Sequence, residues 1–383
     1  MRNGKITVTF VMPSKLIVGG GAEIAAMEYI EYADKDQFDI NIIQTDHVGL
    51  QRLTSEYVQN KISGSNLYTI PDIDWRFNFL KKNKLTRGFF YIIIRPILMN
   101  LLRYTINAQT FRKVKESDVI YLFQNEMAPY FSNFKGKVIG HGGFWVIDPS
   151  SIIFKLVCAG LMWHRIDGFR LFPYAEQYSA SLNKKFNLIL TNGVDCSVFY
   201  PNSEVREDIP KFLFVGRTDV EKGIDILLSA AEKIMVNYNF ELHIAGDGNM
   251  KEAILHSKIP NLKYHGLLTG EDLYDLYRNC DVFVFPTKWD PFPLVIFEAL
   301  ASGLTVLVSD VKKGSYDEFE RLGFLEYVKN DADHYAEAMV KCIEQIEHIR
   351  KLKTPIHEMI VKNNNLDVVS GILYGFFKRI SGK

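Results

Sequence analysis

Short apolar runs alternate along the chain with longer segments in which apolar residues recur at helical spacing. In the first half, the apolar runs predict strands at 5–12, 38–44, 118–123, 137–140 and 187–190. In the second half, they predict strands at 211–215, 240–245, 262–264, 281–285 and 304–308. The intervening patterns predict helices, among them 22–32, 223–236 and 270–279. This alternation is typical of parallel sheets with helices on both faces.

The alternation occurs in two sets, with a break near Tyr200-Pro201. We therefore expect an α/β fold with two Rossmann-like, doubly wound domains, the first at 1–198 and the second at 199–362. The remaining segment, 363–383, is predicted to form a last helix at about 366–380. A chain of 383 residues is long enough for two domains of ordinary size.

Composition narrows the classes of protein to consider. With 47% hydrophobic and 23% charged residues, the chain is globular rather than disordered. The 45 basic and 45 acidic residues give a net charge of zero, which argues against a general nucleic-acid binder. The four cysteines are far apart and form no C-x-x-C, which suits a reducing cytoplasm better than a disulfide framework or a zinc site; they are Cys158, Cys196, Cys280 and Cys342.

Two acids eight positions apart form the first candidate site, in Asp290-Pro-Phe-Pro-Leu-Val-Ile-Phe-Glu298. Upstream, a buried strand is predicted to end at Pro286. Downstream, a helix is predicted from Glu298 to a C-terminal Gly303. The acids then lie beyond the carboxyl end of a strand, where open α/β sheets bind ligands, beside a helix N-terminus suited to phosphate. The alternative is an N-capped helix with a solvated Asp290.

Two cations form the second candidate site. The predicted strand at 211–215 runs into Gly216, and Arg217 and Lys222 follow on a turn that opens a helix at Gly223. Arginine offers a planar fork for a diphosphate, and lysine a mobile point charge. The alternative is a pair of solvated loop cations.

The first domain contributes glycines and a histidine. The sequence Gly19-Gly-Gly-Ala-Glu23 follows the strand at 6–12, and glycine allows the backbone to approach a ligand without a Cβ clash. His141 ends another strand between glycines, so we expect it to be accessible rather than buried. The alternatives are a flexible surface loop and a structural histidine.

In order and spacing, these motifs resemble the retaining family 4 glycosyltransferases, which have the GT-B fold of two domains facing across a cleft. The resemblance implies that the last helix crosses back to the first domain. It also implies that Glu298 holds the ribose of a nucleotide diphosphate sugar and that Asp290 and His141 contact the sugar. The other residues implied to bind the donor are Phe292, Pro293, Leu294, Gly20, Gly21 and Gly216. The family usually has Glu where this chain has Asp290.

The same resemblance implies the chemistry. Arg217 and Lys222 would offset negative charge on the leaving diphosphate, so that neither a metal ion nor another cofactor is expected. The expected reaction is transfer of a sugar, with retention, to a glycan or lipid-linked acceptor in polysaccharide or glycoconjugate synthesis. Two alternatives remain open: a nucleotide-sugar epimerase of the same fold, and a non-catalytic partner subunit.

A basic segment suggests a membrane surface. Residues 81–115 contain nine Lys or Arg and no Asp or Glu, around an apolar stretch that is too short to span a bilayer. This pattern favours docking on an anionic membrane, and the alternative is a core helix with a solvated basic face. We therefore expect a cytoplasmic protein, peripheral on the inner face of the membrane. No signal peptide is apparent before the first strand.

Overall fold

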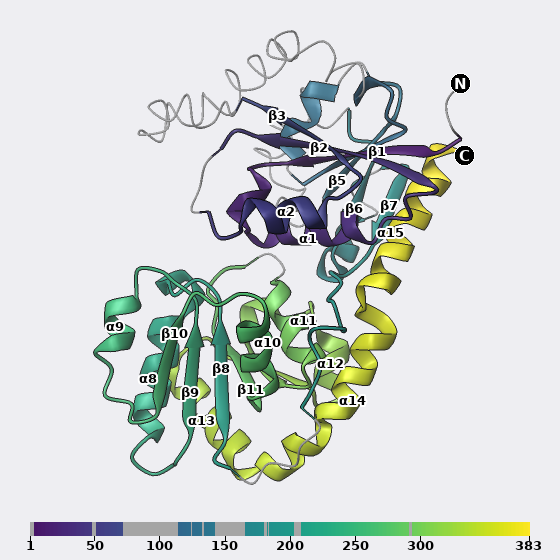
Figure 1. Cartoon of the computed structure of the whole chain (residues 1–383). Coiled ribbons are helices and arrows are strands. Elements are labelled where there is room, and N and C mark those ends of the chain that lie inside the picture. Colours follow the sequence, from purple (N-terminus) through teal and green to yellow (C-terminus); the bar gives the residue numbers. More distant parts are fainter. Residues whose placement is uncertain are drawn as a thin grey trace, which may run out of the picture. The chain divides into compact units, whose positions relative to one another are not determined.

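The structure is a computed structural model (Figure 1). It describes residues 4–47, 51–71, 114–123, 125–131, 134–141, 165–179, 182, 184–202, 208–290 and 293–383. The chain forms two compact units, one of Met1–Thr191 with Val369–Lys383 and the other of Asn192–Val368. The chain passes from one unit to the other at 191/192 and at 368/369. The domain boundaries expected from the sequence were 198/199 and 362/363.

The first unit contains a parallel sheet of seven strands in the order β3-β2-β1-β4-β5-β6-β7. Its strands are β1 (Ile6–Met12), β2 (Phe38–Thr45), β3 (Asn66–Ile70), β4 (Val119–Leu122), β5 (Lys137–His141), β6 (Gly168–Leu171) and β7 (Phe186–Ile189). The order runs outward from β1 in one direction and from β4 in the other. The junction of β1 and β4 is therefore the switch point of this sheet.

Buried side chains cover both faces of the first sheet. On one face, Phe10 of β1 and Tyr121 of β4 stand in register and pack edge to face, with ring centroids 5.6 Å apart. The opposite face carries a second apolar cluster, which includes Val11, Ile120 and Val138. Burial on both faces explains why these strands read as nearly continuous apolar runs.

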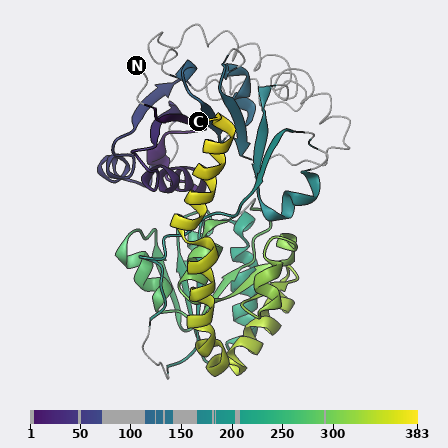
Figure 2. The same ribbon diagram turned by 90° about the vertical axis from the view of Figure 1, so that its right-hand side faces the viewer.

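Helix α15 (Leu366–Ser381) packs on the first unit from Val369 onward (Figures 1 and 2). Phe377 contacts Phe10 and Tyr121, with ring centroids 6.4 and 5.5 Å apart. The Tyr374 hydroxyl donates to the backbone oxygen of Tyr29 in α1 (Gly21–Glu31) at 2.8 Å. Among the described residues, this unit also contains helix α2 (Ser55–Lys61).

The second unit contains a parallel sheet of six strands in the order β10-β9-β8-β11-β12-β13. Its strands are β8 (Lys211–Val215), β9 (Glu241–Ala245), β10 (Leu262–Gly266), β11 (Val282–Phe285), β12 (Thr305–Ser309) and β13 (Leu325–Val328). The chain order runs outward from β8 in one direction and from β11 in the other. Neighbouring β8 and β11 thus form the switch point of the second sheet.

Helices cover both faces of the second sheet. They are α8 (Ile224–Ile234), α9 (Lys251–Leu255), α10 (Glu271–Arg278), α11 (Leu294–Ala301), α12 (Asp317–Arg321), α13 (Ala332–Glu344) and α14 (Ile346–Asn364). Right-handed crossovers place α8 and α9 on one face and α10, α11 and α12 on the other. Helix α13 packs on α8, and α14 packs on α11.

The structure adds three strands that the sequence did not predict, namely β3, β6 and β13. Strands β3 and β13 lie at sheet edges and are only partly buried, so their apolar patterns are weak. Strand β6 lies inside the first sheet, but its four residues include Arg170, which is fully buried. A charged residue in a short run hides a buried strand from pattern analysis.

The membrane prediction falls almost entirely outside the described residues, since only 114 and 115 of the segment 81–115 are described. Among the helices that the structure does describe, none combines the length and apolarity needed to cross a bilayer.

Candidate functional site

Two loops meet at the switch point of the second sheet. One follows β8 at Gly216, and the other follows β11 at Pro286. Gly223 adopts φ +78°, and a Cβ there would lie 1.9 Å from the Pro286 carbonyl oxygen. The Lys288 backbone N–H also donates to the Glu221 carbonyl oxygen at 2.9 Å. Glycine at 223 thus lets the loop with the predicted cations lie directly against the loop with the predicted acid.

Lys222 and Asp290 form an ion pair at this junction. The Lys222 Nζ lies 2.6 Å from Asp290 Oδ2, and the two side chains are only 11% and 17% exposed. Lys222 also donates to the Trp289 carbonyl oxygen at 3.3 Å. The alternative of a solvated Asp290 is therefore wrong, as is that of a solvated Lys222. Asp290 does not cap the helix either, because the N-cap of α11 is Pro293 and no side chain caps it.

Arg217 lies in a different environment from Lys222. Its side chain is 44% exposed, and its guanidinium pairs with Asp219 Oδ2 at 2.5 Å and Glu221 Oε2 at 3.0 Å. Both acids belong to its own loop. The two predicted cations thus have separate acidic partners, and only Lys222 contacts Asp290.

Glu298 lies within α11, one turn after its start at Leu294. The sequence had predicted that the helix begins at Glu298 itself. The β-branched Val295 and Ile296 obscured its first turn, because they also favour strands. The predicted C-terminal glycine is confirmed, since Gly303 follows the helix with φ +77°.

The Glu298 carboxylate accepts a hydrogen bond from the Tyr277 hydroxyl at 2.8 Å. Burial raises the pKa of Glu298 to about 7, although the Tyr277 hydrogen bond lowers it. Tyr277 is itself fully buried in α10, between the rings of Phe199 and Phe283. Glu298 is therefore a half-buried carboxyl whose pKa lies above its ordinary range, and the buried Tyr277 hydroxyl holds it in place.

Pro293 and Leu294 mark the start of α11. Pro293 is the N-cap in extended conformation, and Leu294 is the first helical residue. The backbone N–H groups of this first turn have no partners within the helix. They lie at the N-terminal end of α11, which follows Asp290 in the chain. Phe292 falls outside the described residues.

Lys312 is a functional candidate that the sequence reasoning missed. It ends the short 3-10 helix η8 (Asp310–Lys312), directly after β12, and is 8% exposed. Burial lowers the pKa of its ammonium to about 8, while the Asp290 carboxylate raises it and the Lys222 charge lowers it. The signal available in the sequence was its place after a strand, at the same sheet edge as Lys222 and Asp290.

In the first unit, the predicted glycines form the start of α1. Gly20 is its N-cap, and Gly21 is its first residue. A Cβ on Gly20 would lie 2.6 Å from Glu23 Oε2. Glu23 is buried and accepts a hydrogen bond from the Ser14 hydroxyl. The Gly20 backbone thus lies against the Glu23 carboxylate of its own helix, while Gly21 is exposed.

His141 is more enclosed than the sequence suggested. It ends β5 half-buried, stacked on Phe123 with ring centroids 4.7 Å apart. Its Nδ1 lies 2.8 Å from the Tyr121 hydroxyl, and its Nε2 lies 3.4 Å from Arg170 Nη1. Burial first, and then the Arg170 charge, lower the pKa of His141 well below its ordinary value of 6.5. The expectation of an accessible histidine is corrected, because aromatic neighbours close around the end of this strand.

No group of three or more His, Cys, Asp or Glu side chains that could hold a metal ion occurs in the described part of the chain. Charged groups at the second sheet's carboxyl edge include Lys222 with its partner Asp290, and Arg217 with its partners Asp219 and Glu221.

A family of known proteins matches the part of the chain that contains the motifs of the second unit. Residues 209–345 match the family model described as glycosyl transferases group 1. This segment of the chain is therefore similar to the glycosyl transferases group 1. The segment contains β8 to α13, and with them Lys222, Asp290, Glu298 and Lys312.

Curated glycosyltransferases are also similar to parts of the chain. The uncharacterized glycosyltransferase MJ1607 of Methanocaldococcus jannaschii is 33% identical over 138 residues, which are 34% of this chain and 32% of that protein. An Escherichia coli UDP-Gal:alpha-D-GlcNAc-diphosphoundecaprenol alpha-1,3-galactosyltransferase is 31% identical over 173 residues, 40% of this chain and 44% of that protein. The matches thus span less than half of these relatives' lengths.

Solved structures show the fold over nearly the whole chain. A Rickettsia africae glycosyltransferase superposes with a TM-score of 0.70 at 16% identity, covering 98% of both chains. Anabaena Alr3699/HepE in complex with UDP and glucose gives a TM-score of 0.70 at 15% identity, covering 98% of this chain and 100% of that one. The predicted fold class is confirmed: the chain has the α/β architecture of GT-B structures, with parallel sheets of seven and six strands.

Proposed function

We propose that this protein is a retaining glycosyltransferase that moves a sugar from a nucleotide diphosphate sugar to a glycan or lipid-linked acceptor. The supporting observation is the ion pair of Lys222 and Asp290 at the switch point, in the same unit as the hydrogen-bonded Glu298. A cation, a second acid and a helix N-terminus at one sheet edge suit a donor that carries both phosphate and hydroxyl groups.

Each residue of the second unit would have a distinct task. Lys222 and Arg217 would offset the negative charge that grows on the leaving diphosphate. Glu298, held by Tyr277, would accept hydrogen bonds from the ribose hydroxyls. Asp290 would contact the donor sugar. Backbone N–H groups near Gly216 and at the start of α11, around Leu294, would bind phosphate oxygens.

The first unit would contribute residues that contact the acceptor and the donor sugar. Gly20 and Gly21 expose the backbone at the start of α1, where the helix dipole favours an anion. His141 would contact a sugar hydroxyl, with its orientation set by Tyr121.

In the proposed reaction, the bond between the anomeric carbon and the leaving phosphate oxygen breaks while the acceptor hydroxyl attacks from the same face. The leaving phosphate oxygen takes the acceptor's proton, so the anomeric configuration is retained and no protein nucleophile is needed. The side-chain cations replace a metal ion in this scheme, because they already carry the compensating charge.

A lipid-linked acceptor is supported by a relative whose name describes transfer to a diphosphoundecaprenol-linked sugar. The basic segment 81–115 would dock on an anionic membrane and bring the enzyme to such an acceptor. On this proposal the protein works in the cytoplasm, peripherally on the inner face of the membrane.

The test is a transfer assay with purified full-length protein and panels of UDP-, GDP- and dTDP-sugars. We expect one donor to release nucleoside diphosphate only when a lipid-linked saccharide is added, with an α-linked product from an α-linked donor by NMR. Lys222→Ala should lower turnover at least tenfold, whereas Lys251→Ala, on an exposed helix position, should not.

Three outcomes would contradict the proposal. Conversion of the donor sugar without acceptor would indicate an epimerase. Donor binding without turnover with any acceptor would indicate a non-catalytic subunit. An inverted product would exclude the retaining reaction.

A further inference from the structure

Lys312 is a buried cation beside a pair of charges that already neutralise each other. Lys222 Nζ and Asp290 Oδ2 are 2.6 Å apart, so the carboxylate's single negative charge is matched by Lys222. Lys312 lies close enough to feel both groups and is 8% exposed. The three side chains together carry a net charge of +1 in a largely buried place.

A second buried lysine of the same unit, Lys353, differs from Lys312 because its ammonium has partners within the protein. Lys353, also 8% exposed, donates to the Cys280 carbonyl oxygen at 2.6 Å and lies 3.4 Å from Asp281 Oδ1. Asp281 is fully buried and joins α14 to the sheet through Arg350 as well. Within the described residues, by contrast, no hydrogen bond or salt bridge is formed by the Lys312 ammonium.

A charge in a largely buried place is costly, because burial removes much of the hydration of the side chain. Binding of an anion at this place would offset the charge and explain why a lysine occurs there. The position fits this account, since η8 follows β12 at the carboxyl edge of the sheet, the edge at which Lys222 and Asp290 meet.

We propose, building on the proposed transferase function, that Lys312 is a donor-binding residue which, together with Lys222, holds an oxyanion of the nucleotide sugar. The chemistry recognised is a phosphate or carboxylate oxygen. Two parts of a donor could supply it: the diphosphate, present in every donor, or an acidic group on the sugar, as in a nucleotide diphosphate uronate. In the second case, Lys312 determines which sugar is accepted.

The test measures dissociation constants by calorimetry for the full chain and its Lys312→Met variant. The probes are UDP, UDP-glucose and UDP-glucuronate, with GDP, GDP-mannose and GDP-mannuronate as the second series. Met is one atom shorter than lysine and keeps an unbranched apolar stem, but it removes the charge. Lys313→Met is the matched control, because Lys313 is the adjacent residue and is exposed.

We expect Lys312→Met to weaken binding about tenfold or more, as for loss of a charge-assisted hydrogen bond. An equal loss for all nucleotides that bind identifies the diphosphate as the source of the oxyanion. A loss confined to the uronate identifies the sugar's acidic group. Unchanged affinity for every nucleotide that the wild type binds overturns the inference.

The thermal midpoint of the variants separates a binding role from a structural one. Removing this largely buried charge should leave the unliganded midpoint unchanged or raise it, while the nucleotide-induced rise should shrink. A fall in the unliganded midpoint with an undiminished nucleotide-induced rise would show that Lys312 is structural. If the wild type binds none of the nucleotides, the proposed transferase function itself fails, and that result differs from a wild type that binds as well as its variant.

Discussion

Glu298 shows how burial changes the chemistry of a single residue. Its carboxyl would be fully ionised at neutral pH in water, but burial raises its pKa to about 7. The Tyr277 hydroxyl donates to it and favours the ionised form. On the proposed function, the residue would accept hydrogen bonds from the ribose hydroxyls and shed its proton as they bind.

Replacing Glu298 with Gln should change the pH dependence of stability. Because the folded-state pKa lies above the ordinary value of 4.5, folding is progressively penalised as pH rises from 4.5 to about 7. Gln cannot ionise, so Glu298→Gln should unfold about 2–4 °C higher than wild type at pH 8, a gain of roughly 1 kcal/mol, and show no gain at pH 4.5. Thermal unfolding followed by circular dichroism measures this, with exposed Glu232→Gln as control. An equal difference at both pH values would disprove the raised pKa.

Arg217 provides a second prediction at the residue scale. Its guanidinium is held by Asp219 and Glu221, so the position of its charge is fixed without a ligand. Arg217→Ala should lower turnover at least tenfold, by analogy with losing one charge-stabilising donor. Steady-state kinetics of transfer would measure it, with exposed Arg321→Ala as control. Turnover equal to wild type would remove Arg217 from the proposed mechanism.

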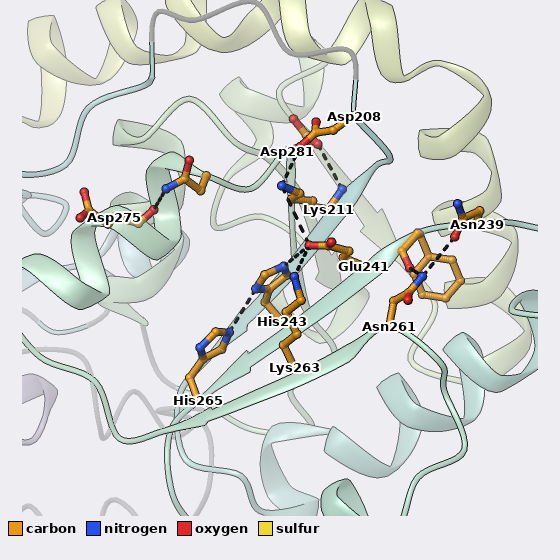
Figure 3. A network of polar contacts seen from close by, with 12 residues as sticks. Asp208, Lys211, Asn239, Glu241, His243, Asn261, Lys263, His265, Asp275 and Asp281 are labelled. Carbon is orange, nitrogen blue, oxygen red and sulfur yellow. Dashed lines mark hydrogen bonds and ion pairs between the residues drawn. The ribbon is translucent and has the colours of Figure 1, made fainter.

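At the scale of elements, β9 and β10 carry a chain of titratable groups across the second sheet (Figure 3). His243 Nε2 lies 2.9 Å from Glu241 Oε2, and His243 Nδ1 lies 3.1 Å from His265 Nε2. Lys263 also donates to Glu241, at 2.9 Å. Burial is the first cause that lowers the pKa of both histidines, so the fold favours their neutral forms.

This pair should make the second unit less stable in mild acid. Since both histidines have folded-state pKa values below the ordinary 6.5, the unfolded chain binds more protons than the folded one below that pH. Stability should therefore be full above about pH 6.5 and fall as pH decreases towards 5. Urea unfolding at pH 7.5 and 5.5 should show a smaller difference in a His243→Gln, His265→Gln double variant. His256→Gln, at an exposed histidine, is the control; a difference as large as in wild type would refute the assignment.

Helix α15 is the element that completes the core of the first unit. Phe377 is fully buried against Phe10 and Tyr121. Phe377→Ala should lower the free energy of unfolding by about 3–5 kcal/mol, because a large cavity would form. Ile372→Ala on the same helix, at a side chain that is 45% exposed, should cost far less. Denaturant unfolding compares the two, and equal losses would show that α15 does not pack as described.

At the scale of the whole molecule, the chain contains two parallel sheets, each with its own switch point. In this fold class, ligands bind outside the carboxyl ends of strands at such points. The candidate residues follow that rule in both units, since Gly20 follows β1 and Lys222 follows β8. Transfer between two substrates is a task for which two such sites on one chain are suited.

Membrane docking would be a property of the whole molecule. Replacing Lys81, Lys82 and Lys84 with Gln should weaken binding to anionic vesicles by roughly two orders of magnitude, at about 1 kcal/mol for each charge. Sedimentation with vesicles at low salt measures this, and added salt should weaken wild-type binding. Lys233→Gln, Lys251→Gln and Lys313→Gln, at exposed positions of the second unit, form the matched control. If wild type and the triple variant bind equally, or if neither binds, the membrane prediction is wrong. The acceptor would then be a soluble molecule.

The sequence by itself determined the fold class and the location of most strands. Apolar runs such as Phe212–Val215 and Val282–Phe285 are buried on both faces, so their pattern is local and strong. Motif spacing also placed Lys222, Asp290 and Glu298 near strand ends, because the carboxyl ends of parallel strands share one edge. These features depend on residues close together in the chain, and therefore they can be read from it.

Only the tertiary structure decided which side chains meet. Lys222 and Asp290 are 68 residues apart, and Tyr277 reaches Glu298 across 21. Lys312 joins the first pair from a third loop, and its burial could not be seen in a segment that reads as polar. Arg170 is hidden in β6 for the same reason. Local hydrophobic patterns specify strands and helices, whereas the partners and desolvation of a charged side chain depend on distant segments that only the folded chain brings together.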